Sequence, residues 1–215
     1  MSVSLERHLS PSLAPTGASA RTRQLMVRTA VELMQRGQTP SVSAAAAAAG
    51  VSRATAYRYF PTQSALVEAV VQQALGPILQ WDSPSRNAEE RVSDLLASSN
   101  ARIVEFKATF KAALGLSLEQ RAQSRSKPAP DGPKFRRGHR IELLEKALAP
   151  IRDKLSDRKF ARLTKALSLT FGLEVILILK DIWNADAGEI QDVATWAARA
   201  LVRAALAEAK AAPAG

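Results

Sequence analysis

SVSAAAAAAGVSRATAYRYF, residues 41–60, reads as two short helices joined by a tight turn. The Ser41 hydroxyl can cap the first helix by accepting a hydrogen bond from an unpaired amide, and the alanine run that follows has the highest helix propensity. Gly50 stands where helices often end in a left-handed residue, and Ser52 is placed to cap the next helix, Arg53–Tyr59. We therefore expect a helix, a glycine turn and a second helix.

The second of these helices carries the groups that nucleic acids bind. Over barely two turns it presents guanidinium, hydroxyl and phenol groups, which suit phosphate oxygens and base edges: Arg53, Thr55, Tyr57, Arg58 and Tyr59. In a helix-turn-helix, the second helix enters the major groove of DNA while the first crosses the backbone. We expect double-stranded DNA to be the partner.

The same residues resemble a known family. The segment VSRATAYRYFPTQSAL is similar to the end of the DNA-binding domain of TetR-type bacterial transcriptional regulators, whose usual pattern is close to AGVSxxTxYxYFxxKxxL. Nine residues match it in register: Ala49, Gly50, Val51, Ser52, Thr55, Tyr57, Tyr59, Phe60 and Leu66. The resemblance implies DNA-binding positions at Ser41, Ser52, Arg53, Ala54, Thr55, Tyr57, Arg58, Tyr59 and Gln63. It also implies an all-α regulator, most often a repressor.

Two positions depart from the family pattern. Gln63 takes the place of a lysine that commonly touches the phosphate backbone, so the contact loses its charge while a hydrogen-bond donor remains. Ala56 takes the place of a branched aliphatic residue just before the tyrosine. We expect a thinner contact between this helix and the core, with the fold unchanged.

The composition agrees with a helical, DNA-binding protein. Of 215 residues, 47% are hydrophobic and only 5% aromatic, which suits helices built on alanine and leucine. The net charge of +10 favours a polyanion, either a nucleic acid or an anionic membrane surface, and the helix pair favours DNA. There are no cysteines, no long apolar run and no apolar signal core, so we expect a cytoplasmic protein without metal, cofactor or membrane contact.

Three regions are expected along the chain. Residues 1–20 are rich in serine and proline and predict a mobile arm, and residues 21–76 form the helix-turn-helix domain, whose last helix should stop at Gly76 and Pro77. Residues 77–215 form the effector-binding and dimerisation domain, beginning with a helix over 88–114. Segment 121–140 has seven basic residues against one acidic, and we expect a solvated loop that could alternatively touch DNA flanks or an acidic ligand.

The C-terminal end predicts two long helices and an interface between subunits. One should reach from Ser156 to Trp183 and is apolar on nearly every face between Leu167 and Leu179; the other should span 189–210 with a stripe of small residues. In TetR-type dimers the last two helices of each subunit form a four-helix interface. We therefore expect a homodimer held by Leu169, Leu173, Ile176, Val193, Ala197, Ala200 and Ala204, on a near-palindromic operator; an intramolecular core is the alternative.

The resemblance also implies a small-molecule effector in the C-terminal domain. Candidate ligand-binding residues are the larger side chains expected near the centre of that domain: Asn100, Phe106, Phe110, Phe171, Glu174 and Trp183. Glu174 interrupts an apolar stretch, and a buried carboxylate needs a partner. That partner is either a ligand or an arginine of the same or the other subunit.

Other classes of function have weaker support in the sequence. For an enzyme, the chain offers only His8 and His139, and it has no phosphate loop, nucleophile elbow or metal-ligand spacing. A non-specific or architectural nucleic-acid binder could use the net charge alone, but it would lose affinity steeply with salt and ignore sequence. Within the favoured class, an activator remains an alternative to a repressor.

Overall fold

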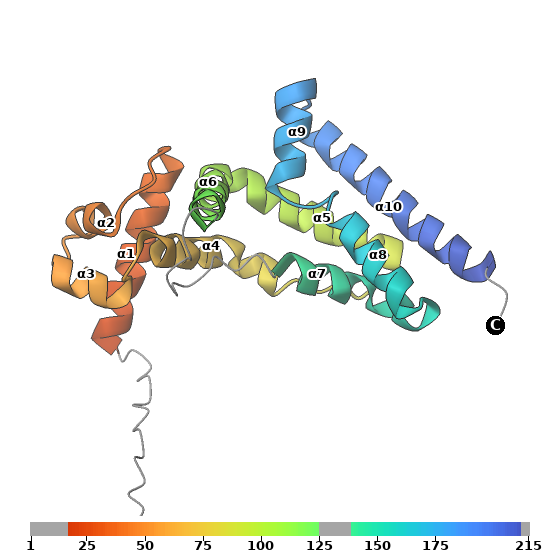
Figure 1. Cartoon of the computed structure of the whole chain (residues 1–215), viewed down its shortest axis with the longest axis horizontal. Helices are drawn as coiled ribbons and strands as arrows, with labels where there is room; N and C mark the ends of the chain where they lie inside the picture. Colours follow the sequence, from red (N-terminus) through yellow and green to blue (C-terminus); the bar gives the residue numbers. More distant parts are fainter. Residues whose placement is uncertain (1–16, 125–138, 212–215) are drawn as a thin grey trace, which may run out of the picture.

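The computed structural model describes residues 17–124 and 139–211, and these fold entirely into helices and their connections (Figure 1). The all-α prediction is confirmed, and no strand occurs within these ranges. The elements are α1 Gly17–Gln35, α2 Val42–Ala48, α3 Arg53–Tyr59, α4 Gln63–Leu79, α5 Ala88–Glu105, α6 Lys107–Ser124, α7 His139–Leu148, the 3-10 helix η1 Ala149–Lys154, α8 Asp157–Leu167, α9 Leu173–Trp183 and α10 Ala187–Ala211. None of the helices described here has both the length and the apolar character that crossing a membrane requires.

Helices α1 to α4 gather around an N-terminal core, at one end of the long axis in Figure 1. α1 contributes residues spaced four apart, which places them on one face of a helix. The fully buried side chains of this core include Met26, Ala30, Met34, Val42, Ala45, Ala46, Phe60, Leu66 and Val70. α1 begins five residues earlier than the predicted Thr22. Of the predicted arm, residues 17–20 therefore belong to α1, and residues 1–16 lie outside the described ranges.

Helix α4 joins the two halves of the molecule without a break. The predicted stop at Gly76 and Pro77 is wrong, because Pro77 lies in the last turn and costs the helix only one backbone hydrogen bond. Val70 belongs to the N-terminal core while Ile78 is buried in the C-terminal core, and Leu75 packs against both. The predicted domain boundary thus falls inside a helix that both cores share.

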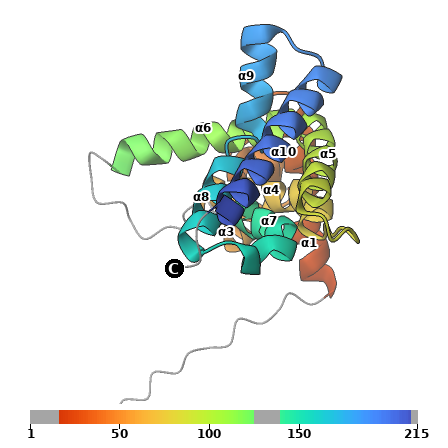
Figure 2. The same cartoon turned by 90° about the vertical axis from the view of Figure 1, so that its right-hand side faces the viewer.

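The helix predicted over 88–114 is two helices. α5 ends at Glu105, and Phe106 leaves the helical conformation with φ −105° and ψ 27°. Its ring is buried in the N-terminal core, whereas Val92 and Leu95 of α5 are buried in the C-terminal core. One straight helix cannot bury these residues in both cores, so the chain changes direction at Phe106. Gly115 lies inside α6. Figures 1 and 2 show α6 leaving the line of α5.

The helix predicted from Ser156 to Trp183 is also interrupted. α8 ends at Leu167 and α9 starts at Leu173, with Gly172 between them at φ 118° and ψ −178°, a conformation essentially restricted to glycine. α10 agrees with the predicted span of 189–210 to within two residues at either end. It buries the face formed by Ile190, Ala194, Ala198, Val202 and Ala205 and packs mainly along α5.

Candidate functional site

The helix-turn-helix forms as its caps and glycine predict. The Ser41 Oγ accepts a hydrogen bond from the Ala44 amide at 3.1 Å at the start of α2. Gly50 takes a positive φ of 65° in the turn, and the Ser52 Oγ accepts from the Thr55 amide at 3.3 Å at the start of α3. Ser52 Oγ also donates to the Thr55 hydroxyl at 2.9 Å, which fixes the Thr55 side chain on the first turn of α3.

Helix α3 turns one face to the core and the other to solvent. Ala56 is 0% exposed and Phe60 beyond the helix end is 1% exposed, so these two residues anchor the helix. The opposite face carries the predicted DNA-binding side chains, with Thr55 and Tyr59 half-buried and the rest exposed: Arg53, Ala54, Tyr57 and Arg58. The helix is thus held by a methyl group on one side and offers two guanidiniums and a phenol on the other.

The two tyrosines of α3 are held by serines from other helices. The Tyr57 hydroxyl lies 3.2 Å from the Ser43 hydroxyl of α2, and the Tyr59 hydroxyl lies 2.8 Å from the Ser19 hydroxyl of α1. The hydrogen bond to Ser19 lowers the pKa of the Tyr59 phenol, as does the nearby Arg58 guanidinium, whose Cζ lies 5.3 Å from the ring centre. These contacts orient both phenols before any DNA is bound.

Gln63, predicted as a DNA contact, uses its side-chain amide within the protein. The Nε2 donates to the carbonyl oxygens of Thr39 at 3.3 Å and Pro40 at 3.1 Å. It therefore ties the start of α4 to the segment that leads into α2. No local sequence pattern indicates this role, because the bonded residues are 24 and 23 positions apart.

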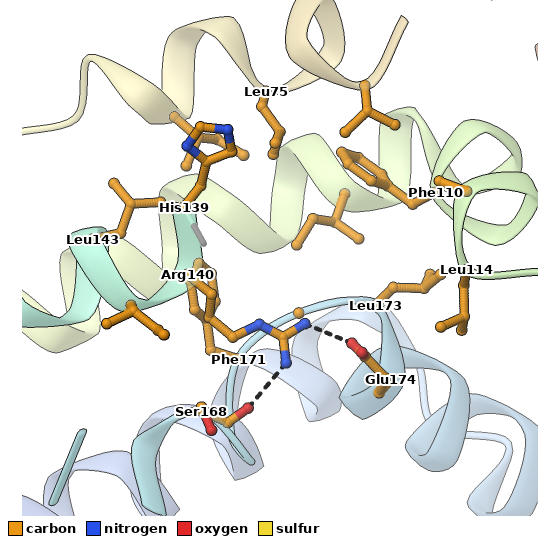
Figure 3. A pocket seen from close by; sticks show the side chains of 16 residues that line it. Leu75, Phe110, Leu114, His139, Arg140, Leu143, Ser168, Phe171, Leu173 and Glu174 are labelled. Carbon is orange, nitrogen blue, oxygen red and sulfur yellow. Dashed lines mark hydrogen bonds and ion pairs between the residues drawn. The ribbon is translucent and has the colours of Figure 1, made fainter. Parts of the chain in front are cut away.

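A cavity of about 280 Å³ lies in the C-terminal half, between α4, α5, α6, α7 and the start of α9 (Figure 3). Most of its lining is aliphatic or aromatic, including Leu75, Ile78, Ile103, Leu114, Leu143 and Leu173. Three of the predicted ligand-binding residues line it: Phe110, Phe171 and Glu174. His139 and Arg140 also line it; they are the last two residues of segment 121–140, for which an acidic ligand was one alternative.

The other three predicted ligand-binding residues lie elsewhere. Phe106 is buried in the N-terminal core, with the Arg102 guanidinium 4.0 Å from its ring centre. Asn100 is buried at the α5–α10 contact, where its Nδ2 donates to Gln191 at 2.9 Å. Trp183 ends α9 with 74% of its surface exposed. The sequence shows the type of each of these residues, but it does not show toward which neighbouring helices their side chains point.

The predicted interface residues divide between two environments. Leu173 and Ile176 are buried in their own chain, in a small cluster with Ile103 and Ile190. Leu169, Val193, Ala200 and Ala204 are exposed, and Ala197 is half-buried. Beside them α9 and α10 expose further large apolar side chains that the sequence did not single out as interface residues: Ile178, Ile182, Trp183 and Trp196. Figure 2 shows α9 and α10 together on the face of the molecule turned toward the viewer.

Comparisons with known proteins match this geometry. Residues 27–70, from within α1 to within α4, match the family model described as bacterial regulatory proteins, tetR family. The chain is similar to the crystal structure of a TetR transcriptional regulator from Rhodococcus sp. RHA1, with 20% identity and a TM-score of 0.58 over 85% of this chain and 96% of that chain. At that identity the likeness shows the fold. No match was found among curated proteins.

Proposed function

We propose that the chain is a transcriptional regulator of the tetR type, which the match of residues 27–70 to that family supports, and that it acts as a dimeric repressor of a near-palindromic operator. A small molecule bound in the C-terminal cavity would release it from DNA. Three features support these three parts of the proposal: the exposed face of α3, the apolar face of α9 and α10, and the cavity between α4 and α9. The first of them carries the proposal.

The exposed face of α3 has the chemistry of a recognition helix. Arg53 and Arg58 can bind phosphate or guanine, and the Thr55 hydroxyl can contact either phosphate or a base edge. The module from Arg21 to Gly76 contains six arginines against two glutamates, a net charge of +4 that attracts a polyanion. Because the Ala56 side of α3 is buried, this face is the one left for the major groove.

The outward face of α9 and α10 supports the dimer. Trp183 and Trp196 are each 74% exposed and Ile182 is 71% exposed, so large apolar surfaces face water in the single chain. Apolar patches of this kind on soluble proteins mark interaction sites. A second copy of the same face would cover them, and a two-fold pair of α3 helices would then meet two half-sites about one turn of DNA apart, roughly 34–36 Å.

The cavity supports release by an effector because α4, which lines it, also packs in the N-terminal core that holds α3. Val71 and Leu75 of the cavity belong to α4, and the side-chain amide nitrogen of Gln72 on the same helix lies 2.8 Å from Nε2 of His139. A ligand that binds better when α4 has moved would shift the protein toward that conformation. Since α4 also carries Leu66 and Val70 of the N-terminal core, such a movement would reorient α3.

Selection of bound duplexes from random DNA tests the proposal. We expect an inverted repeat, bound by two chains, and a preference over random duplexes of roughly a thousandfold or more at physiological salt. A direct repeat or a single half-site bound by one chain would contradict the dimer. Binding that ignores sequence and falls steeply with salt would instead identify a non-specific nucleic-acid binder, which the net charge of +10 also favours. A reporter assay with the selected operator separates a repressor from an activator.

A further inference from the structure

We propose that the ligand of the cavity is a small organic carboxylate with an apolar body, and that its carboxylate binds the Arg140 guanidinium in exchange with Glu174. This inference rests on the proposed function only where it makes that ligand the effector. The binding site itself depends on the residues of the cavity alone.

The lining of the cavity is mostly apolar, with an ion pair on one side. Leu75 and Phe110 lie across the cavity from this Arg140–Glu174 pair in Figure 3, and Ile78, Ile103 and Leu143 add further apolar wall. The polar side chains, His139, Arg140, Ser168 and Glu174, come from α7 and the residues before and at the start of α9. A ligand that fills this space needs an apolar body and a polar end.

Arg140 is positioned as the polar anchor. Its Nη2 donates to Glu174 Oε2 at 2.7 Å and its Nη1 donates to the Ser168 carbonyl at 3.2 Å. A Cβ atom at residue 172 would overlap Arg140 Nη2, so glycine at this position leaves the space through which the arginine crosses the start of α9. The planar guanidinium binds carboxylates through paired hydrogen bonds, and the Glu174 contact already shows a carboxylate at this atom.

The surroundings favour an anion over a cation. The first amides of α9 lack intrahelical acceptors, as at the start of any helix, and Gly172 provides no side chain to cap them; they form the positive end of the helix dipole beside the cavity. A cationic ligand would meet this end and Arg140 together. An anionic ligand is attracted by both. Glu174 can give up Arg140, because 40% of its side chain is exposed to water and it lies in that same first turn.

Replacing Glu174 by the ligand carboxylate on Arg140 would also change how α7 and α9 are held together. The Arg140–Glu174 ion pair joins the first turn of α7 to the first turn of α9. A ligand carboxylate on Arg140 replaces this link with one between α7 and the ligand. α9 then loses its contact with Arg140, and an effector acts through such a difference in contacts between two conformations.

Calorimetric titration of the full-length protein, free of DNA, tests the inference with matched probes. Octanoate, octanol and octylamine share one body, and phenylpropionate, phenylpropanol and phenylpropylamine share another. We expect both carboxylates to bind more tightly than their alcohols and amines by on the order of tenfold, the effect of one charge-assisted hydrogen bond. Failure of both carboxylates to bind, or equal binding of the alcohols or amines, would overturn the proposal.

Two variants with opposite expected effects test whether the ligand carboxylate binds Arg140. Arg140→Gln should remove the preference for octanoate over octanol, and Glu174→Gln should tighten octanoate binding several-fold because the competing carboxylate is gone. Glu145→Gln on the exposed side of α7 is the control and should change neither. Weaker octanoate binding in Glu174→Gln would contradict the exchange even if Arg140→Gln fails to fold.

The outcome can be separated from that of the proposed function. Carboxylate binding is measured without DNA, and operator binding is measured without carboxylate. Carboxylate binding with no effect on DNA would leave the site intact and remove its role as an effector site. Operator binding by a protein that ignores all the carboxylates would leave the regulator intact and remove the ligand class.

Discussion

Arg53, Thr55 and Tyr57 occupy different positions on the exposed face of α3, and they should affect DNA binding differently. Arg53 is exposed on the first turn, and Thr55 is oriented by Ser52 at 2.9 Å, so both can meet base edges. We predict that Arg53→Ala and Thr55→Ala weaken operator binding and alter base preference, by about 1–3 kcal/mol per lost base contact. Tyr57→Phe should lower affinity for all sites alike. Binding curves on the operator and its single-base variants measure this, and uniform losses from all three would contradict it.

Gln63 should act on stability rather than on DNA contact. Its two hydrogen bonds, to the carbonyls of Thr39 and Pro40, hold the segment before α2 against α4. We predict that Gln63→Ala lowers the free energy of unfolding by about 1 kcal/mol, a usual net value for a hydrogen bond in a protein. Urea unfolding measures the change. Gln73→Ala, on the same helix as Gln63, removes an exposed hydrogen bond from Gln24 of α1; it is the control and should cost less.

At this scale the sequence predicts what is local. The Ser41 and Ser52 caps follow from neighbours three residues away, and both form. The Ser19–Tyr59 bond spans 40 residues and the Arg140–Glu174 pair spans 34, so no short pattern marks either of them. Such contacts depend on how helices pack, and periodicity along one helix holds no information about its neighbours.

At the scale of elements, the positions where helices end were the hardest to predict. The helix ends at Phe106, between α5 and α6, although this position holds neither glycine nor proline. Its ring is buried in the N-terminal core, whereas α5 packs in the C-terminal core. Pro77 has the opposite outcome, since a proline in the last turn of α4 does not stop it. The ends of α2 and α3 are predictable from sequence, because a capping serine precedes each of these seven-residue helices and a glycine with positive φ lies in the turn between them.

Gly172 gives a direct test of the break between α8 and α9. Alanine there must adopt φ 118°, which costs about 1–3 kcal/mol, and its Cβ would also collide with Arg140 Nη2. We predict that Gly172→Ala lowers the unfolding free energy by about that amount, measured by thermal or denaturant unfolding. Combining it with Arg140→Gln should restore part of the loss by removing the collision.

Gly115 is the matched control for this substitution. It lies inside α6, and a Cβ there meets nothing within 4 Å. Gly115→Ala should therefore be neutral or stabilising by up to about 1 kcal/mol, the difference in helix propensity. If Gly172→Ala unfolds at the same denaturant concentration as Gly115→Ala, the strain assigned to residue 172 is not there.

At the scale of the whole molecule, the outward face of α9 and α10 decides the number of chains. The sequence predicted an apolar stretch too wide for one chain to cover, and Ile176 is buried while Ile178 and Ile182 are exposed. It could not assign which residues face outward, since that depends on the angle at which α9 packs. The basic residues of 125–138 lie outside the described ranges, so their predicted role stays a prediction.

Placing a charge on this face should separate the chains. We predict that Trp196→Asp gives the sedimentation mass of a monomer at micromolar concentration, keeps its helical circular dichroism and loses most of its operator affinity. Leu118→Asp is the control, because Leu118 is also exposed, at 56%, but belongs to α6, which Figure 2 shows extending away from α9 and α10. A wild-type protein that sediments as a monomer while binding its operator tightly would contradict the dimer.

The central claim is that α3 reads a DNA sequence. The most direct measurement is a competition at physiological salt between the selected operator and a duplex with the same bases in scrambled order, using the purified full-length protein. We predict a ratio of dissociation constants of roughly a thousandfold or more for the wild type, reduced strongly in Arg53→Ala. Equal dissociation constants for the two duplexes would contradict the claim.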